Sequence, residues 1–109
     1  HFEQASAFAL PEPDKSFDLV YTFAALEQMQ DGFPKALSEL RRVARRYVLL
    51  HEPFRDCNDP LGCLYLWSRN YFRLSAGALP RYGLRPVATW YSLPMKPTFA
   101  YGFVLCELM

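Results

Sequence analysis

The first clear pattern along the chain is an almost continuous apolar run, FDLVYTF, at Phe17–Phe23. Its residues are nearly all β-branched, aromatic or otherwise apolar, and polar positions do not alternate with them. Strands of this kind are typical of parallel sheets, in which both faces are covered. Upstream, Pro11 and Pro13 exclude a helix, and the polar residues after them predict a solvated turn. We therefore expect a strand at Phe17–Phe23 that is buried on both faces.

The following segment, DGFPKALSELRRVARR at 31–46, repeats apolar residues at helical spacing. Asp31 is the expected N-terminal cap, Pro34 suits the first turn, and arginines gather at the C-terminal end. A second apolar strand, YVLL at 47–50, comes next and ends at His51-Glu52-Pro53. Strand, helix and strand in this order predict a βαβ crossover with parallel strands.

The rest of the chain predicts further helices and then two strands. Pro60 opens a helix that reaches about Arg69, and a second helical stretch covers 71–82, where Gly83 ends it. Strands are expected at Leu84–Tyr91 and Tyr101–Leu108. The linker SLPMKPTF between them is too short for a helical crossover, which predicts an antiparallel pair. The expected fold class is α/β.

Length and composition limit the number of domains and the class of protein. The chain has 109 residues, which suffices for one small domain at 1–109. Its hydrophobic content of 51% and aromatic content of 17% exclude a disordered chain. No apolar run approaches the ~20 residues of a membrane span. The opening HFEQ predicts no signal peptide, and its lack of methionine leads us to expect that an upstream segment has been removed.

The cysteines bear on location and on metal binding. Cys57, Cys63 and Cys106 are odd in number and lack the spacing of metal ligands. We interpret them as reduced thiols of a cytoplasmic protein, and we expect no metal site.

Several short motifs occur along the chain in a fixed order, and together they resemble one family. They are Ser6-Ala7, Leu10-Pro11, Phe17-Asp18-Leu19-Val20, Leu26-Glu27-Gln28, SELRRV at Ser38–Val43 and YVLLHEP at Tyr47–Pro53. The combined pattern covers nearly the whole chain and resembles the C-terminal half of the class I methyltransferases (type 11) that use S-adenosylmethionine. The resemblance implies half of a doubly wound, Rossmann-like sheet whose parallel strands are followed by an antiparallel hairpin.

The resemblance also implies a cofactor site. In open α/β sheets, ligands bind outside the carboxyl ends of the strands. By position in the family motif, Ser6 and Ala7 would line the adenine of S-adenosylmethionine, and Phe23 would lie under the cofactor. The implied activity of the complete enzyme is methyl transfer to a small-molecule acceptor.

The chain departs from the family pattern in ways that predict a partner. The family's glycine-rich loop and its acidic ribose ligand are absent, Ser6 replaces Asp or Asn, and Gln28 replaces His. We expect this chain to pair with a missing N-terminal half or to self-associate. The alternative function is a non-catalytic interaction or oligomerisation module, since Phe17–Phe23 would then be an apolar sheet edge that needs a cover.

Three groups of residues have both a functional and a structural interpretation. His51 and Glu52, at a strand's carboxyl end, could take a proton from the acceptor, or could be held there by hydrogen bonds. Glu27 could act in the same way or stabilise a helix N-terminus. The aromatic residues of 54–72 could form a substrate lid or pack as core.

The one basic cluster is expected to be structural. Arg41, Arg42, Arg45 and Arg46 complement the C-terminus of the helix, and Glu39 with other acids offsets them. Nucleic-acid binding is the disfavoured alternative, and its sign would be salt-dependent binding to a generic duplex.

Overall fold

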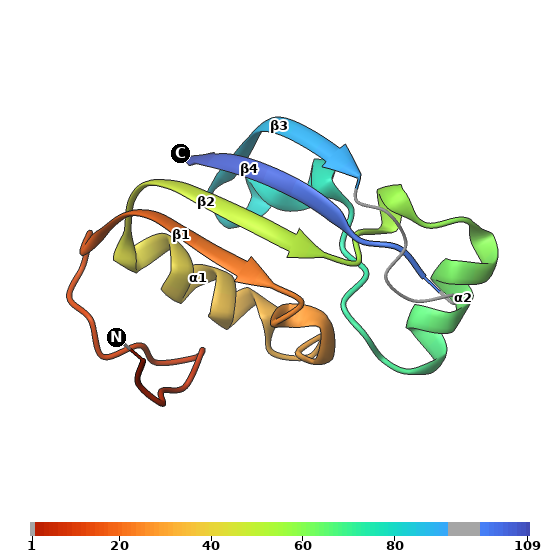
Figure 1. Cartoon of the computed structure of the whole chain (residues 1–109), viewed down its shortest axis with the longest axis horizontal. Helices are drawn as coiled ribbons and strands as arrows, with labels where there is room; N and C mark the ends of the chain where they lie inside the picture. Colours follow the sequence, from red (N-terminus) through yellow and green to blue (C-terminus); the bar gives the residue numbers. More distant parts are fainter. Residues whose placement is uncertain (1, 92–98) are drawn as a thin grey trace.

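The computed structural model describes residues 2–91 and 99–109, and their strands form one mixed sheet in the order β1-β2-β4-β3 (Figure 1). In the described part of the chain, two α-helices and three short 3-10 helices connect the strands. The strands are β1 (Phe17–Phe23), β2 (Ala44–Glu52), β3 (Leu84–Tyr91) and β4 (Gly102–Leu108), the helices are α1 (Phe33–Val43) and α2 (Pro60–Ser68), and the 3-10 helices are η1 (Leu26–Gln28), η2 (Arg55–Cys57) and η3 (Ala76–Tyr82). The predicted α/β class is confirmed.

The βαβ unit at the start of the chain is confirmed. β1 and β2 are parallel, and Phe23 and His51 are their last register partners, at the carboxyl ends of the two strands. The predicted helix boundaries are wrong at both ends, however. Gly32, not Asp31, occupies the N-cap position of α1, because the Asp31 carboxylate accepts a hydrogen bond from Asn70 at 3.1 Å.

At its other end, α1 stops at Val43, and β2 begins three residues earlier than the predicted strand at 47–50. Ala44 is already extended, with ψ of 140°. The Arg42 carbonyl accepts the Lys15 N–H at 2.9 Å, and Arg45 in β2 pairs with Asp18 in β1. These contacts with the segment around β1 favour an extended backbone over another helical turn.

The sheet is covered on one face only by the described residues. α1 and η3 pack on that face, where the main core includes Leu37, Val48, Leu79 and Val104 (Figure 1). The expectation that β1 is buried on both faces is wrong for this structure. Leu19, Tyr21 and Phe23 alternate along the opposite face, and their exposed fractions are 48%, 69% and 55%.

The second half of the chain follows the prediction with one exception. α2 starts and ends close to the expected bounds, and the Asp59 carboxylate caps it by accepting the Gly62 N–H at 2.7 Å. The helical stretch expected at 71–82 is reduced to the 3-10 helix η3, which contains Pro80, and Pro lacks the N–H that an α-helix needs. Gly83 ends it in the left-handed conformation, with φ of 79°.

The final two strands are antiparallel, as predicted, and β4 lies between β2 and β3. The part of their linker at 92–98 lies outside the described residues. Within the described part of the chain, no helix has the length and apolar character needed to cross a membrane.

Candidate functional site

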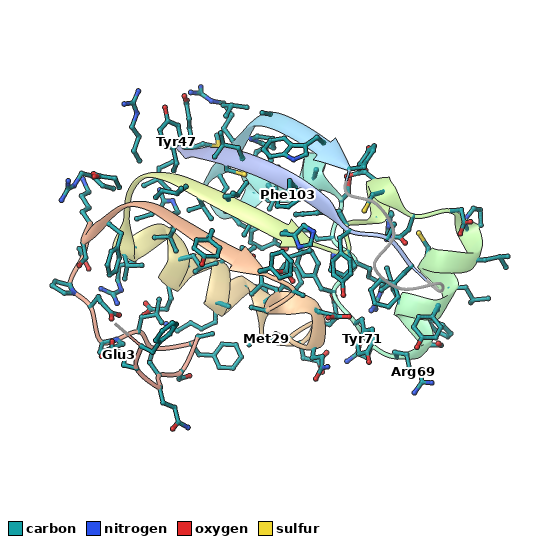
Figure 2. All side chains as sticks on the ribbon, viewed as in Figure 1. Glu3, Met29, Tyr47, Arg69, Tyr71 and Phe103 are labelled. Atoms are coloured by element: carbon teal, nitrogen blue, oxygen red, sulfur yellow. The ribbon has the colours of Figure 1, made fainter. Side chains whose placement is uncertain are left out.

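The carboxyl ends of β1 and β2 bring together aromatic rings on the open face of the sheet. Phe23 and His51 are register partners, and their ring centroids lie 4.3 Å apart. His51 also contacts Phe103 on β4 at 4.2 Å, and Phe103 stacks on Trp90 of β3 at 5.4 Å (Figure 2). The result is a row of rings that crosses all four strands, with the half-exposed Phe23 at the β1 edge.

A strained turn follows Phe23. Ala24 has a positive φ of 54°, which costs a non-glycine residue on the order of 1 kcal/mol. The end of β2 holds this turn in place: the Ala24 N–H donates to the His51 carbonyl at 2.8 Å, and the Ala25 N–H donates to Glu52 Oε2 at 3.0 Å. Strain of this kind persists only where its surroundings determine the backbone, and it is common beside functional sites.

Glu52 is completely buried beneath this turn. Its Oε1 atom has no hydrogen-bond partner in the described part of the chain. Burial raises the pKa of Glu52 to about 7, because a charged carboxylate loses its hydration there. A large fraction of this side chain is therefore protonated near neutral pH, and it acts as the acceptor for the Ala25 N–H.

A second buried pair ties η1 to the start of β4. The Tyr101 hydroxyl donates to Glu27 Oε1 at 3.0 Å, and the Glu27 carbonyl accepts the Phe72 N–H at 2.7 Å. Burial, together with Glu27, raises the pKa of Tyr101 far above its usual value, so its hydroxyl stays protonated. Glu27 does not stabilise the N-terminus of α1, which begins beyond it at Phe33, but links three connecting segments at this end of the sheet.

The two candidate catalytic residues, His51 and Glu52, are placed at the expected strand end but neither reaches the surface. Their exposed fractions are 1% and 0%. Burial lowers the pKa of His51, which favours the neutral imidazole between its aromatic neighbours. Glu52 is held by a backbone N–H, as its structural interpretation predicts. A catalytic role for either residue stays a prediction.

Ser6 and Ala7 lie in a turn before β1. The Ser6 hydroxyl accepts the Phe8 N–H at 3.2 Å, and its carbonyl accepts the Ala9 N–H at 3.1 Å. The Phe8 ring lies so close to Gly32 that an added Cβ there would be only 2.7 Å away. Because Gly32 is the N-cap of α1, this contact places the Phe8 ring, next to the turn, against the start of that helix.

The sequence reasoning missed the clamp that holds this turn. Glu39 on α1 accepts the Leu10 N–H at 2.7 Å, and Arg42 donates to the carbonyls of Leu10 and Glu12 at 3.0 and 2.9 Å. Glu39 and Arg42 also bind each other through two hydrogen bonds. Their i,i+3 spacing predicts that the two side chains pair with each other on the helix. It does not indicate that they also bind the backbone before β1.

The aromatic residues of 54–72 divide between two places. Phe54 and Phe72 belong to the main core, whereas Tyr65 and Tyr71 pack with Phe99 and Tyr101 in a smaller cluster beside α2. Leu61, Leu64 and Trp67 on α2 are exposed. Among the described residues, no group of histidine, cysteine and acidic side chains could hold a metal ion.

Comparison with known proteins identifies the fold. Residues 1–50 match the family model described as a methyltransferase domain. A similar solved structure is a SAM-dependent methyltransferase from Methanosarcina mazei, with a TM-score of 0.72 and 13% identity over 96% of this chain and 65% of that one. The chain has the fold of the S-adenosylmethionine-dependent methyltransferases. The resemblance to class I methyltransferases seen in the sequence is thereby confirmed.

Two further structures show the range of proteins with this methyltransferase fold. Magnesium protoporphyrin IX methyltransferase from Synechocystis, solved with bound S-adenosylhomocysteine, has a TM-score of 0.67 and 14% identity over 96% of this chain and 49% of that one. A cyclase has a TM-score of 0.69 and 13% identity, covering 98% of this chain and 55% of the cyclase. The chain thus spans about half to two thirds of the matched structures. No curated protein matches it.

The residues present fit one side of an S-adenosylmethionine site. Phe23 offers a half-exposed ring at the strand end, and the Ala7 N–H donates no hydrogen bond within the described residues. The Ser6 oxygen, already an acceptor, has a second lone pair. The opposite side, which a glycine-rich loop would form, has no counterpart in this chain.

Proposed function

We propose that this chain forms part of an enzyme that transfers a methyl group from S-adenosylmethionine to a small-molecule acceptor. The observation that carries the proposal is the position of Phe23. It lies half-exposed at the carboxyl end of a parallel strand, in a methyltransferase fold. Since a cyclase shares the fold, the site must decide the reaction.

The residues of this chain would bind and orient rather than take part covalently. S-adenosylmethionine supplies an activated methyl group on a cationic sulfonium. The Phe23 ring would attract that cation, since an aromatic face favours positive charge within about 6 Å. Ser6 and Ala7 would hold the adenine through the serine oxygen and the Ala7 N–H. Transfer from a sulfonium relies mainly on alignment and exclusion of water, and it needs no dedicated base.

The proposal includes a partner for β1. The outer edge of β1 is unpaired in the described residues, and Leu19, Tyr21 and Phe23 expose apolar surface beside it. Exposed apolar edge strands favour pairing with another strand. We propose that the glycine-rich part of the methyltransferase domain adds a strand at this edge and completes the cofactor site. We also propose a cytoplasmic location, because all three cysteines are free thiols.

Titration calorimetry with S-adenosylhomocysteine tests this function on the product of the complete reading frame that encodes the chain. We expect saturable binding, weakened about tenfold or more by Phe23→Ala, because the cation-free product still stacks on the ring. Phe2→Ala, which changes a fully exposed phenylalanine, is the matched control and should leave the affinity unchanged. A folded sample without saturable binding, or equal effects of the two variants, would overturn the proposal.

The exposed face of β1 also supports a second candidate function, a non-catalytic oligomerisation module. In that case, copies of this chain would pair through β1, and the sheet would be continuous across the dimer. A stable dimer that binds no S-adenosylhomocysteine would favour this candidate over the enzyme.

A further inference from the structure

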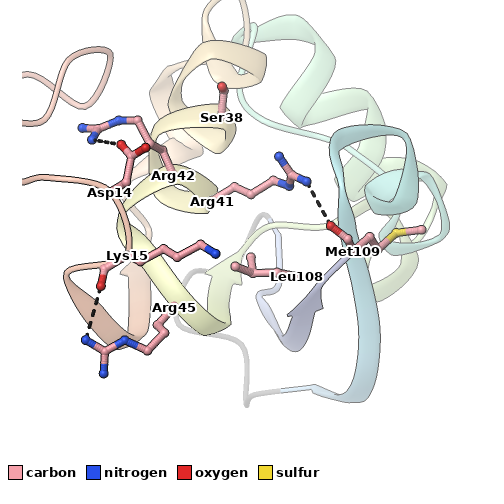
Figure 3. A pocket seen from close by; sticks show the side chains of 8 residues that line it. All are labelled: Asp14, Lys15, Ser38, Arg41, Arg42, Arg45, Leu108 and Met109. Atoms are coloured by element: carbon pink, nitrogen blue, oxygen red, sulfur yellow. Dashed lines mark hydrogen bonds and ion pairs between the residues drawn. The ribbon is translucent and has the colours of Figure 1, made fainter.

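A cavity of about 520 Å³ lies near the amino-terminal ends of β1 and β2, the ends opposite Phe23. Figure 3 shows the side chains that line it. Three elements supply its walls: the turn before β1, the last turns of α1 and the start of β2. The end of β4 adds an apolar floor. Its lining residues are Asp14, Lys15, Ser38, Arg41, Arg42, Arg45, Leu108 and Met109.

Among the described residues, acidic side chains pair with two of the four cations that line this cavity. Arg42 pairs with Glu39 and Asp14, and Arg45 pairs with Asp18 at 2.7 Å. The predicted pairing with acids is confirmed for Arg42 and Arg45, whereas the prediction that Arg45 and Arg46 complement the helix C-terminus is wrong, because both lie in β2. Among the described residues, however, no carboxylate side chain forms an ion pair with Lys15 or Arg41.

Backbone hydrogen bonds fix the main chain of Lys15 and the guanidinium of Arg41. The Lys15 N–H donates to the Arg42 carbonyl at 2.9 Å, its own carbonyl accepts from Arg45, and its φ of 55° is left-handed. Arg41 donates to the carbonyls of Gly83 and Met109. Figure 3 shows the Lys15 side chain extending toward Leu108, with Arg41 on the neighbouring wall.

The helix dipole explains part of this arrangement but leaves Lys15 unexplained. Arg41 and Arg42 lie in the last turn of α1, where a cation offsets the partial negative charge of the helix end. Lys15 lies outside the helix, so the helix dipole does not explain its place in the wall of this cavity. An anion bound among cations of like charge reduces their mutual repulsion.

We propose that this cavity binds the phosphate group of a small organic phosphate. Lys15 and Arg41 would bind the phosphate oxygens, and Ser38 would add a hydroxyl donor. The apolar side chains of Leu108 and Met109 would contact the organic part. The cavity lies at the amino-terminal ends of β1 and β2, so this site is separate from the proposed methyl-transfer site and does not depend on it.

Titration calorimetry with inorganic pyrophosphate tests the proposal directly. We expect saturable binding that weakens with added salt, and a loss of about tenfold in affinity for Lys15→Gln, the scale of one charge-assisted hydrogen bond. Lys35→Gln is the matched control, since it removes the same charge from an exposed position of α1 outside the cavity. The affinity of this control variant for pyrophosphate should stay within about twofold of that of the parent protein.

Changes in backbone chemical shifts show where pyrophosphate binds. The proposal expects pyrophosphate to move the amide signals of Lys15, Ser38 and Arg41 and to leave those around Phe23 unchanged. Equal losses of affinity in Lys15→Gln and Lys35→Gln would mean that only overall charge attracts the anion. That result, or the absence of saturable binding to a folded sample, would overturn the proposal.

Discussion

Glu52 shows how a single buried acid can hold a turn without carrying a charge. It occupies the last position of β2, and it accepts the N–H of Ala25 in the strained turn that follows β1. A neutral carboxylic acid can serve as that acceptor, and neutrality avoids the large cost of burying a charge. Phe23, directly before this turn, therefore depends on Glu52 for its orientation.

This arrangement predicts a specific pH dependence. The pKa of Glu52 is raised from 4.5 to about 7, so the folded state binds more protons than the unfolded state between these values. Stability should therefore fall as pH rises from about 4.5 to 7, by about 3 kcal/mol from this group alone. Glu52→Gln, which keeps an acceptor for Ala25, should remove most of that slope. Urea unfolding across this pH range measures it, and an unchanged slope in the variant would contradict the assignment.

Gly83 gives a second prediction at the scale of one residue. Its φ of 79° is left-handed, and an added Cβ would also meet the Arg41 side chain. Gly83→Ala should lower the free energy of unfolding by about 1–2 kcal/mol. Gly77→Ala, in the 3-10 helix that Gly83 ends, meets only the Ser75 hydroxyl at 3.7 Å and should be close to neutral. Denaturant unfolding of the two variants compares them, and equal effects would be inconsistent with this explanation.

At the scale of elements, α1 connects the sheet to the turn that precedes β1. Glu39 and Arg42 on this helix bind the backbone on both sides of Pro11. Hydrogen bonds from Arg42 and from the Leu10 N–H lower the pKa of Glu39 to about 2. The clamp thus positions the Ser6-Ala7 turn relative to the end of β1.

Loss of this clamp should release the turn. A depressed carboxylate pKa stabilises the fold above the unfolded value of 4.5, and that contribution is lost as pH falls toward 2. Glu39→Gln should therefore reduce stability at pH 7 and have a smaller effect near pH 3. It should also speed amide exchange at Leu10. Hydrogen exchange and unfolding at both pH values test this, and unchanged exchange at Leu10 would rule out the clamp.

The exposed edge and open face of β1 give a second prediction at the scale of elements. If its edge and open face form a pairing surface, the isolated chain should self-associate with rising concentration. Tyr21→Lys should shift it toward the monomer, because a charge on an edge strand opposes pairing. Thr89→Lys on β3, the other edge, is the control and should leave association unchanged. Light scattering during gel filtration measures the mass. If the isolated chain is a monomer at every concentration, β1 is not a pairing surface.

The sequence predicted elements better than it predicted their surroundings. The apolar run of Phe17–Phe23 and the strand Leu84–Tyr91 have the predicted bounds, because their residue types favour extended backbone directly. The end of α1 could not be predicted, since Ala44 and Arg45 suit a helix and become extended only through contacts with β1. The same holds at the site. Phe23 and His51 were predictable from strand ends, whereas the Glu27–Tyr101 bond joins residues far apart in sequence.

For the whole molecule, the structure has two chemically different ends. The carboxyl ends of β1 and β2 carry aromatic rings and buried acids, and the opposite end carries a basic cavity. One face of the sheet is covered by α1 and η3, while the other presents apolar side chains in the described residues. The proposed continuation of a methyltransferase domain beyond β1 would account for the open edge and would complete the proposed cofactor site.

The most direct test is to locate S-adenosylhomocysteine on the product of the complete reading frame by backbone chemical shifts. The account predicts shifts concentrated at Ala7, Phe23 and Ala24, with the basic cavity around Lys15 unaffected. Shifts confined to other parts of the molecule, or none at saturating ligand, would contradict the assignment of the cofactor site to the carboxyl end of β1.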